Sequence, residues 1–340
     1  MTTRPAVTVL LGDPSLPDAS KPGNRYNPED FDAIARMKAA LEEEDAFDLT
    51  FVDRHEGLPG RFMESPPEFV MNLCDVGYRN RSQLELHVVA LMEMLEIPYS
   101  GNNPAAITLC NDKALIHAAA RDVGVPVPEQ RFWSSADAVD DFDLPYPVIV
   151  KPNRTHGSLG ITKDAVVNNP EEAKAYLAML TGLLPGHSVL MQEYLSGSEY
   201  SVGIIGNTAD DYLVLPPVEV DYSGLPEGLS PILSYESKTI PDSPYWTDIR
   251  YHEAKIDTAL RQRLSGYAVA MFERLGCQDY ARCDFRTGAD GTIKLLEMNP
   301  NPAWSFDGKL AMMAGFAGMR YGEMLGRIID VARRRSGLAG

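Results

Sequence analysis

Residues 279–299 read DYARCDFRTGADGTIKLLEMN, and this stretch decides the fold and the chemistry expected of the chain. Two runs of strand-forming residues flank the turn signal GADG, which predicts two neighbouring strands joined in a hairpin. Side chains two residues apart share a face of a strand. Arg282 and Asp284 are therefore expected to project from one side of the sheet, and Glu297 and Asn299 likewise.

Two carboxylates and an amide oxygen beside one guanidinium form a set of hard oxygen donors. Mg²⁺ prefers such ligands and often takes its remaining ones from phosphates. The alternative is an exposed strand pair that carries salt bridges, and the charge pattern alone does not separate the two. The surrounding sequence favours the metal site.

A second signal lies upstream, where an apolar strand ends in a lysine. Residues 147–152 read PVIVKP, and a loop with glycines follows at residues 155–160. Lys151 at the end of such a strand can reach phosphate oxygens, and Gly157 and Ser158 let backbone N–H groups approach them. By itself the loop could equally be an ordinary hairpin turn.

Alternating strands and helices occupy the first hundred residues. Ala6 to Leu11 predicts a strand, and Asn27 opens a helix whose buried face could carry Phe31, Ile34 and Leu41. Further strands are predicted at 47–52 and 69–73, a helix at 84–95 and a strand-like segment at 97–99. Alternation of this kind predicts a parallel sheet.

The rest of the chain is predicted to be mixed α and β. Helices are expected after Asn111-Asp112 and at 170–180, with strands at 146–152, 188–192, 200–205 and 212–220. A Pro-, Ser- and Gly-rich stretch at 221–245 should be irregular, as functional lids often are. A helix over 256–275, the hairpin and a terminal pair of helices complete the chain.

Composition is that of a soluble enzyme rather than of a disordered or nucleic-acid-binding chain. The 340 residues are 44% hydrophobic and 23% charged, and 31 Lys and Arg against 48 Asp and Glu give a formal charge of −17. Such a surface repels nucleic acid and anionic lipid, so neither is expected as a partner. The spacing of the four cysteines and six histidines predicts neither disulfides nor zinc, and the absence of a signal peptide and of a membrane span favours the cytoplasm.

Four motifs together give the chain a resemblance to a known family. They are Asn111-Asp112-Lys113, residues 148–152 (VIVKP), residues 192–200 (QEYLSGSEY) and residues 295–300 (LLEMNP). Their order and approximate spacing resemble those of ATP-grasp enzymes, and the D-alanine–D-alanine ligase branch is the most similar, from about residue 68 to the C-terminus. The resemblance implies an α/β ATP-grasp fold with a Rossmann-like N-terminal subdomain (1–103) and two α+β subdomains (104–194 and 195–340) that clasp ATP.

The resemblance also implies roles for particular residues. Lys113 and Lys151 would hold the nucleotide phosphates under the loop that contains Gly157 and Ser158, Arg282 would stabilise the oxyanion of the tetrahedral intermediate, and Ser158 would belong to the catalytic residues as well. The adenine and ribose would be bound by Gln192, Glu193, Tyr194, Leu195 and Glu199. Two Mg²⁺ ions, with Mn²⁺ as an alternative, would be ligated by Asp284, Glu297 and Asn299. The competing interpretations are solvated lysines and a plain strand–turn–strand.

The long stretch contains Tyr235-Glu236-Ser237-Lys238, which is similar to a motif on the family's mobile lid. There Lys238 would contact the transferred phosphate, and closure would exclude water. The alternative is a flexible acidic loop with an incidental lysine. By the same resemblance, the enzyme would join a small-molecule carboxylate and an amine through an acyl phosphate, and it would be a homodimer.

Departures from the family pattern fall where amino acids are recognised. The loop after the first strand reads LGDPSL at 11–16, residues 74–80 read CDVGYRN, and residues 299–305 read NPNPAWS, where the family carries other motifs. We therefore expect a ligase for another amino acid or amino-acid-like metabolite, with strict D-alanine–D-alanine ligation as one alternative and a non-catalytic nucleotide-binding module as another. Trp304 indicates either a different acceptor or a core-packing indole. Asp13, Arg25, Arg79 and Lys309 are candidates for binding the ammonium or carboxylate groups of the substrates, and each could equally be a surface charge.

Overall fold

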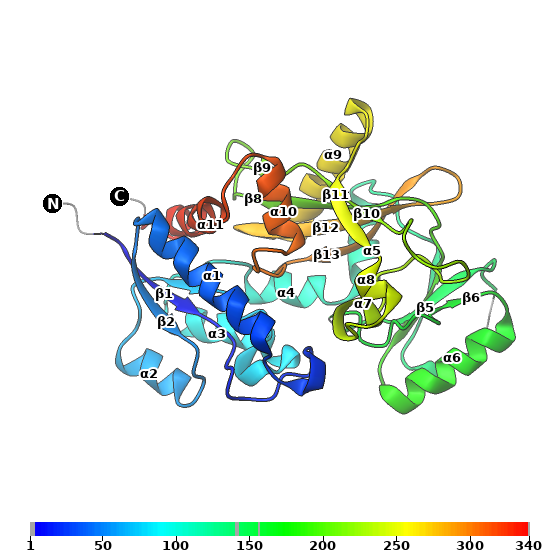
Figure 1. The fold of residues 1–340 in the computed structure, drawn as a ribbon, viewed down its shortest axis with the longest axis horizontal. Coiled ribbons are helices and arrows are strands. Elements are labelled where there is room, and N and C mark those ends of the chain that lie inside the picture. Colours follow the sequence, from blue (N-terminus) through cyan, green and yellow to red (C-terminus); the bar gives the residue numbers. More distant parts are fainter. Residues whose placement is uncertain (1–3, 140–142, 156, 339–340) are drawn as a thin grey trace.

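The computed structural model describes residues 4–139, 143–155 and 157–338, which form three sheets surrounded by helices (Figure 1). Each sheet takes its strands from one part of the chain, and the predicted boundaries at 103/104 and 194/195 fall between the sheets. The division into three subdomains stays a prediction. Single turns of 3₁₀ helix occur in the connections at Pro22–Asn24, Tyr78–Asn80, Ser82–Leu84 and Ala136–Ala138.

The first sheet is parallel, in the order β2-β1-β3, as strand–helix alternation predicts. Its strands are β1 (Ala6–Leu10), β2 (Asp48–Val52) and β3 (Val70–Asn72), and Tyr99 pairs with β3 through a single bridge. The helices of this part are α1 (Pro28–Glu44), α2 (Leu58–Glu64) and α3 (Glu85–Met94). The carboxyl ends of these strands lead into the loops that face the cavity described below.

Helix α1 begins where the sequence predicts, and of the three residues expected on its buried face, Leu41 is buried, Ile34 packs against the core and Phe31 is exposed. The Asn27 side chain accepts hydrogen bonds from the N–H groups of Glu29 and Asp30, and the Asp30 carboxylate accepts from Asn27 N. Met37 and Leu41 are fully buried, whereas Phe31 is 51% exposed. The expectation that Phe31 is buried was wrong: its ring instead lies 6.1 Å from that of Tyr26 at the surface.

The last helix returns to the first sheet. Helix α11 (Tyr321–Arg335) lies beside α1, and its buried residues share one core with β1 and β3 (Figure 1). Residues far apart in the sequence therefore build the N-terminal core together. The short helix α10 (Lys309–Phe316) connects this core to the third sheet.

The second sheet is antiparallel, in the order β4-β7-β5-β6. It comprises β4 (Gln130–Trp133), β5 (Val148–Pro152), β6 (Val166–Val167) and β7 (Val189–Glu193), with α6 (Pro170–Leu183) packed against it. Strand β5 is buried along its length and ends at Lys151-Pro152, so the lysine leaves the sheet at a fixed position. The sequence did not predict β4 or β6.

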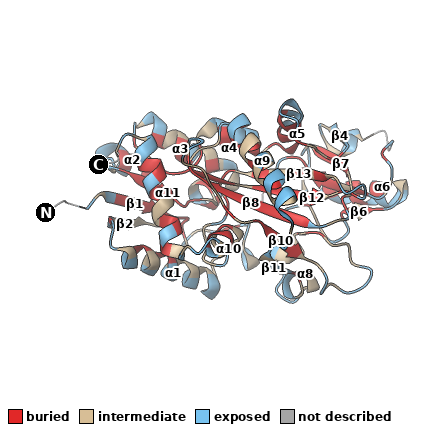
Figure 2. Ribbon diagram, turned by 90° about the horizontal axis from the view of Figure 1, so that it is seen from above, coloured by how far each residue is buried: buried red, intermediate tan, exposed pale blue. Residues whose placement is uncertain are grey.

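The third sheet contains the predicted hairpin. Its main path is β11-β10-β8-β12-β13, with β9 beside β8, and the strands are β8 (Glu199–Ile205), β9 (Leu213–Val214), β10 (Val218–Asp221), β11 (Arg250–Glu253), β12 (Tyr280–Thr287) and β13 (Ile293–Asn299). Strand β8 is buried throughout (Figure 2). One strand was expected over 212–220, but Pro216-Pro217 divides it into two, because proline cannot donate to a ladder.

Helices cover the third sheet and connect it to the second. Helix α9 (Thr258–Arg274), capped by Asp257, shares a core with α5 (Lys113–Asp122), which Asp112 caps as predicted. Helix α4 (Pro104–Cys110) precedes α5 and was not predicted. The stretch 221–245, expected to be irregular, contains two single-turn helices, α7 (Glu236–Thr239) and α8 (Pro244–Thr247).

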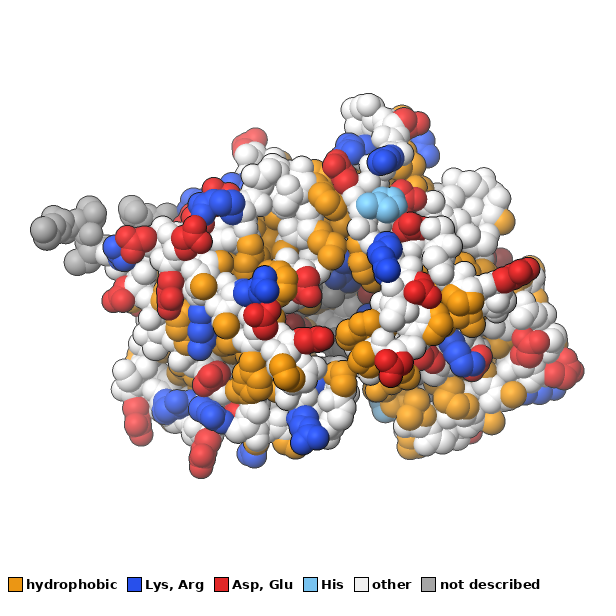
Figure 3. All heavy atoms as spheres, viewed as in Figure 1, with side chains coloured by type: hydrophobic (Ala, Val, Ile, Leu, Met, Phe, Trp, Pro, Cys, Tyr) orange, Lys and Arg blue, Asp and Glu red, His pale blue; other side chains and the backbone are white. Residues whose placement is uncertain are grey.

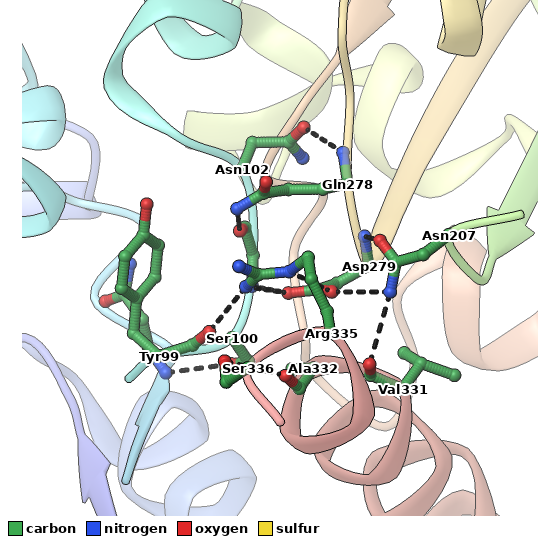
Figure 4. A network of polar contacts seen from close by, with 12 residues as sticks. Tyr99, Ser100, Asn102, Asn207, Gln278, Asp279, Val331, Ala332, Arg335 and Ser336 are labelled. Atoms are coloured by element: carbon green, nitrogen blue, oxygen red, sulfur yellow. Dashed lines mark hydrogen bonds and ion pairs between the residues drawn. The ribbon is translucent and has the colours of Figure 1, made fainter. Parts of the chain in front are cut away.

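A buried polar network joins the N-terminal part to the third sheet (Figure 4). The fully buried Asp279 accepts hydrogen bonds from Gly101 N at 2.8 Å, from Asn207 Nδ2 at 2.9 Å and from two nitrogens of Arg335 at 2.9 and 2.8 Å. Nearby, Asn102 Nδ2 donates to the carbonyls of Tyr280 and Pro300. These bonds hold the loop after β13 against the N-terminal part, so the cavity residues of both are fixed relative to each other.

Candidate active site

One cavity of about 720 Å³ lies where the three sheets meet, and its mouth is visible as the hollow near the middle of the molecule (Figure 3). Every residue predicted to act in catalysis, nucleotide binding or metal binding lines it. These residues are Lys113, Lys151, Gly157, Ser158, Gln192, Glu193, Tyr194, Leu195, Glu199, Lys238, Arg282, Asp284, Glu297 and Asn299. The structure therefore brings together side chains that are spread over 187 positions of sequence, from 113 to 299.

Strands β12 and β13 present the predicted oxygen ligands as two cross-strand pairs. Arg282 lies opposite Asn299 and Asp284 opposite Glu297, and a register shift follows between Asp284 and Phe285. Directly opposed side chains project from the same face. The predicted set of two carboxylates, one amide and one guanidinium is thus present on one surface of the sheet.

Arg282 and Asp284 are joined by two parallel hydrogen bonds. Arg282 Nε donates to Asp284 Oδ1 at 2.9 Å and Nη2 donates to Oδ2 at 2.8 Å, while Ser201 Oγ donates to Oδ1 at 2.6 Å. Burial alone would raise the pKa of Asp284, but the charges of Arg282 and Lys309 lower it below its ordinary value. Asp284 is therefore ionised and fixed in orientation. Among the described residues, Nη1 of Arg282 makes no hydrogen bond.

Lys113 and Lys151 are both buried at the opposite wall of the cavity. Burial lowers the pKa of Lys151 to about 7, and the neighbouring charge of Lys113 adds to the effect. Burial also lowers the pKa of Lys113, whereas the carboxylate of Glu297 acts in the other direction on both lysines. Two desolvated ammonium groups near the Glu297 carboxylate form a site in which an anion has strong electrostatic partners.

Two loops close over the lysines and are hydrogen-bonded to each other. Ser158, whose φ of 61° is positive, donates from Oγ to the carbonyl of Leu233 at 2.9 Å, and Tyr235 N donates to the carbonyl of Ile161 at 2.7 Å. Helix α7 places Lys238 at the cavity. Its side chain is accessible from the cavity, but the surrounding protein desolvates the ammonium and lowers its pKa. Position 156 of the loop lies outside the described residues.

The predicted adenine and ribose residues form the far end of the cavity. Glu193 binds Lys294 through both carboxylate oxygens, at 2.7 and 2.8 Å, and Gln192 Nε2 donates to Gln130 Oε1 at 3.0 Å. The side chains of Glu193 and Gln192 are thus hydrogen-bonded to other residues of the protein and form part of the cavity wall. Buried Glu199 accepts from Tyr222 OH at 2.7 Å and pairs with Arg286 Nη1 at 3.4 Å.

The sequence did not predict several other residues of the cavity. Tyr251 on β11 lines the cavity and was not predicted, whereas Tyr222, which donates to Glu199, lies outside the lining. At the end of the cavity nearest the N-terminal part, Asp18, Asp75 and Glu85 contribute carboxyl groups, and Arg81 and Asn301 lie in the same lining. Glu85 gave no distinct signal, because an acidic residue at the start of a helix is common in any protein.

Of the substrate anchors considered, only Lys309 lines the cavity. Its ammonium donates to Ser201 Oγ at 3.1 Å, beside Asp284. Asp13 is buried and accepts from the N–H groups of His55 and Ser15, so it has a structural role, and Arg25 and Arg79 are exposed outside the lining. Trp304 also lies outside the lining, where its Nε1 donates to the carbonyl of Leu73 at 2.9 Å, which supports the core-packing interpretation.

The chemistry of the donors selects among metals. In the described part of the chain, no cluster of three or more His, Cys, Asp or Glu suits a metal ion. A soft or fully protein-held metal site is therefore not formed by those residues. Asp284, Glu297 and Asn299 instead supply a few hard oxygens beside two lysines, which fits Mg²⁺ whose remaining ligands are phosphate oxygens and water.

No helix in the described ranges is both long and apolar enough to cross a membrane.

Comparisons with known proteins agree with this arrangement. Residues 121–330 match the family model described as "D-ala D-ala ligase C-terminus". The chain is 32% identical over 252 residues to the uncharacterized protein y4sG of Sinorhizobium fredii, covering 73% of this chain and 70% of that protein. It is 30% identical to the vancomycin B-type resistance protein VanB of Enterococcus faecalis, covering 73% and 69%. The structure of a D-alanine–D-alanine ligase from Bacillus anthracis complexed with ATP shares the fold, with a TM-score of 0.71, 19% identity and 98% of each chain covered.

Proposed function

Since the chain belongs to the D-alanine–D-alanine ligase family of ATP-grasp enzymes, we propose that its cavity joins an amino-acid carboxylate to an amine at the expense of ATP, with the residue roles given below. The activity class follows from the family: the chain is an ATP-dependent, ADP-forming ligase that makes carbon–nitrogen bonds. The observation that carries the assignment of residues is that every predicted one lines a single cavity.

In this proposal Lys113 and Lys151 hold the nucleotide phosphates, since both are buried cations that line the cavity near the Glu297 carboxylate. The loop with Gly157 and Ser158 covers the phosphates, and residues 192–195 with Glu199 bind the adenine and ribose. Phosphate oxygens restore the charge of lysines that burial has made easier to deprotonate. Binding of ATP is therefore expected to couple to proton uptake.

We assign Asp284, Glu297 and Asn299 to Mg²⁺. Bound there, Mg²⁺ would neutralise phosphate charge as the γ-phosphoryl group is transferred. The protein fixes this set through the bidentate contact of Arg282 with Asp284 and through Asn301 N, which donates to Asn299 Oδ1 at 2.9 Å. Outer contacts of this type hold ligands in orientation.

The reaction follows in two steps. The substrate carboxylate attacks the γ-phosphorus of ATP, ADP leaves, and the second substrate's amine then attacks the acyl phosphate and expels phosphate. Lys238 lies at the cavity beside Glu297 and Arg282 and is placed to contact the transferred phosphoryl group. Arg282 keeps Nη1 for the developing oxyanion, because Asp284 occupies its other two nitrogens.

Catalysis here depends on positioning and exclusion of water. The two hydrogen-bonded loops, at Ser158 and Tyr235, cover the site in which the acyl phosphate forms, and an acyl phosphate hydrolyses readily in water. No dedicated base was found in the sequence, so we assign deprotonation of the amine to solvent or to phosphate. Both substrates are small molecules, and we keep the homodimer expected from the family as part of the proposal.

The substrate differs from D-alanine in this proposal, with true D-alanine–D-alanine ligation as the alternative. The walls nearest the N-terminal part use Asp18, Asp75 and Glu85 in place of the family motifs that are missing there. Such a change alters amino-acid recognition while the nucleotide end keeps its pattern. Activity with other amino acids is the expected consequence.

Phosphate release across a panel of amino acids, with Mg·ATP present and hydroxylamine added, tests the proposal. A hydroxamate formed from one carboxylate would identify the donor, and its yield should fall at least about 100-fold in Arg282→Lys or Asp284→Asn. Lys174→Met, an exposed lysine on α6, is the matched control and should behave as the wild type. ATP binding without hydroxamate from any carboxylate would instead support the non-catalytic module.

A further inference from the structure

The end of the cavity nearest the N-terminal part carries more negative charge than the proposed reaction needs. We call Asp18, Asp75 and Glu85 the acidic end; all three line the cavity, and they come from two loops and the start of α3. The nucleotide phosphates and the proposed metal are accounted for by other residues. The acidic end therefore calls for its own ligand.

Asp18 is the most telling member of the acidic end. Only 2% of it is exposed, and its Oδ1 accepts hydrogen bonds from Ser20 N at 2.9 Å and Ser20 Oγ at 2.6 Å. Its Oδ2 is buried and has no hydrogen-bond partner among the described residues. A buried carboxylate oxygen without a donor is costly, and a cationic ligand that donates to it would remove that cost.

Glu85 and Asp75 are the other two carboxyl groups of the acidic end. Glu85 is 5% exposed and accepts from Asn301 Nδ2 at 3.1 Å, which places it against the loop that follows the proposed metal ligands. Burial raises the pKa of Glu85 to about 7 and that of Asp75 to about 6, and repulsion between neighbouring carboxylates adds to both shifts. Asp18 is thus close enough to act on the charge of Asp75, and Asp75 on that of Glu85.

Among the described residues, no lysine or arginine forms an ion pair with Asp18 or Asp75. Lys21 is the cation that acts on Asp75, but it is committed to Asp30 at 2.6 Å. Lys309 lies on the metal side, beside Ser201 and Asp284. A metal ion is also a poor answer, because no described group of three acids, His or Cys is arranged to hold one. An organic cation remains.

We propose that the acidic end binds a substrate with two cationic groups, such as a diamino acid or another amino acid with a basic side chain. The inference rests on the proposed function, since it concerns a substrate of that same ligase. One α-ammonium can satisfy one carboxylate, and three carboxyl groups in a closed cavity leave room for a second cation. Arg81, in the same lining, is placed for the substrate's carboxylate.

Pairs of amino acids that differ only in the terminal charge test this directly. Lysine is compared with norleucine and ornithine with norvaline, as both enantiomers, alone and together with D-alanine. We expect kcat/KM for ADP formation to favour the charged member by about 10- to 100-fold, the effect of one charge-assisted hydrogen bond. Calorimetric binding of the same pairs to the enzyme with Mg·ADP gives a readout that does not need turnover.

Two isosteric variants locate the effect. Asp18→Asn and Glu85→Gln should each reduce the preference for the charged member over the uncharged member at least about fivefold through KM. Asp32→Asn, an exposed acid on α1 outside the cavity, should keep the full preference. Unchanged Mg·ATP affinity shows that each variant is folded.

The outcomes separate this inference from the function on which it rests. Hydroxamate formation from amino acids, with equal kcat/KM and equal binding for charged and uncharged members, would overturn the acidic-end proposal and leave the ligase intact. A preference that survives in both variants would overturn it as well. Binding that favours the charged member without hydroxamate from any carboxylate would remove the proposed reaction and keep the cation site.

Discussion

Removing the ammonium of Lys151 should abolish proton uptake when ATP binds. In the free enzyme, burial and the neighbouring Lys113 lower the pKa of Lys151 to about 7. Phosphate oxygens beside the ammonium favour its charged form and should return the pKa toward its ordinary value of 10.5. The lysine therefore gains a proton on binding whenever the pH exceeds its pKa in the free enzyme.

The magnitude follows from that shift. At about pH 8 roughly a tenth of Lys151 is protonated in the free enzyme and nearly all of it in the complex, so binding takes up about 0.9 proton. Near pH 6 the uptake falls to about 0.1 proton. Lys151→Met removes this component, and the loss of one charged hydrogen bond should weaken Mg·ATP binding by about 10- to 100-fold.

Calorimetry in two buffers of different ionisation enthalpy measures the uptake. Wild type and the control Lys174→Met should both show the steep increase between about pH 6 and 8, and Lys151→Met should not. An uptake in Lys151→Met equal to that of the wild type would refute the reasoning. So would wild-type uptake near zero at about pH 8, because Lys151 would then be charged before the nucleotide arrives.

Three further predictions address the metal, the scaffold and the acidic end. Asp284→Asn should raise the Mg²⁺ concentration for half-maximal activity and lower kcat/KM at least about 100-fold; an unchanged magnesium response would remove Asp284 from the ligand set. Asp279→Ala leaves Arg335 partly buried without its partner and should lower the free energy of unfolding in urea by about 3–5 kcal/mol, whereas a loss below about 1 kcal/mol would contradict the role given to the network. Glu85 has a folded-state pKa of about 7 against an ordinary 4.5, so its stabilising contribution is complete below the unfolded-state value and lost as the pH rises through 7. Glu85→Gln should therefore stabilise the protein by up to roughly 3 kcal/mol near pH 8 and hardly at all near pH 4, as measured by thermal unfolding at both pH values; equal effects at the two would exclude a buried charge.

Sequence predicted the parts of the fold that local rules determine. The alternation around Arg282 and Asp284 and the GADG turn were enough to place both strands and the shared face, and Asp112 was enough to begin a helix. Lys151, Glu199 and Asn299 lie at the ends of strands, and Arg282 and Asp284 lie inside the central hairpin, so local patterns place most of the predicted site residues.

Long-range packing explains what was missed. Phe31 has the right spacing for a buried face, yet only the position of α11 beside α1 decides which face is covered. The acidic end joins Asp18 to Glu85 across 67 residues, and neither belongs to a periodic pattern that could relate them. Trp304 was ambiguous for the same reason, since its partner is the carbonyl of Leu73 on a distant strand.

The bonds that tie Ser158 to Leu233 and Tyr235 to Ile161 have a kinetic consequence. Because the two loops are hydrogen-bonded to each other, we expect them to open and close over the cavity together, as one cooperative unit. ADP and the ligated product would then leave during the same opening of the loops. We expect that weakening either bond speeds the departure of the products and lets more of the reactive intermediate escape to water.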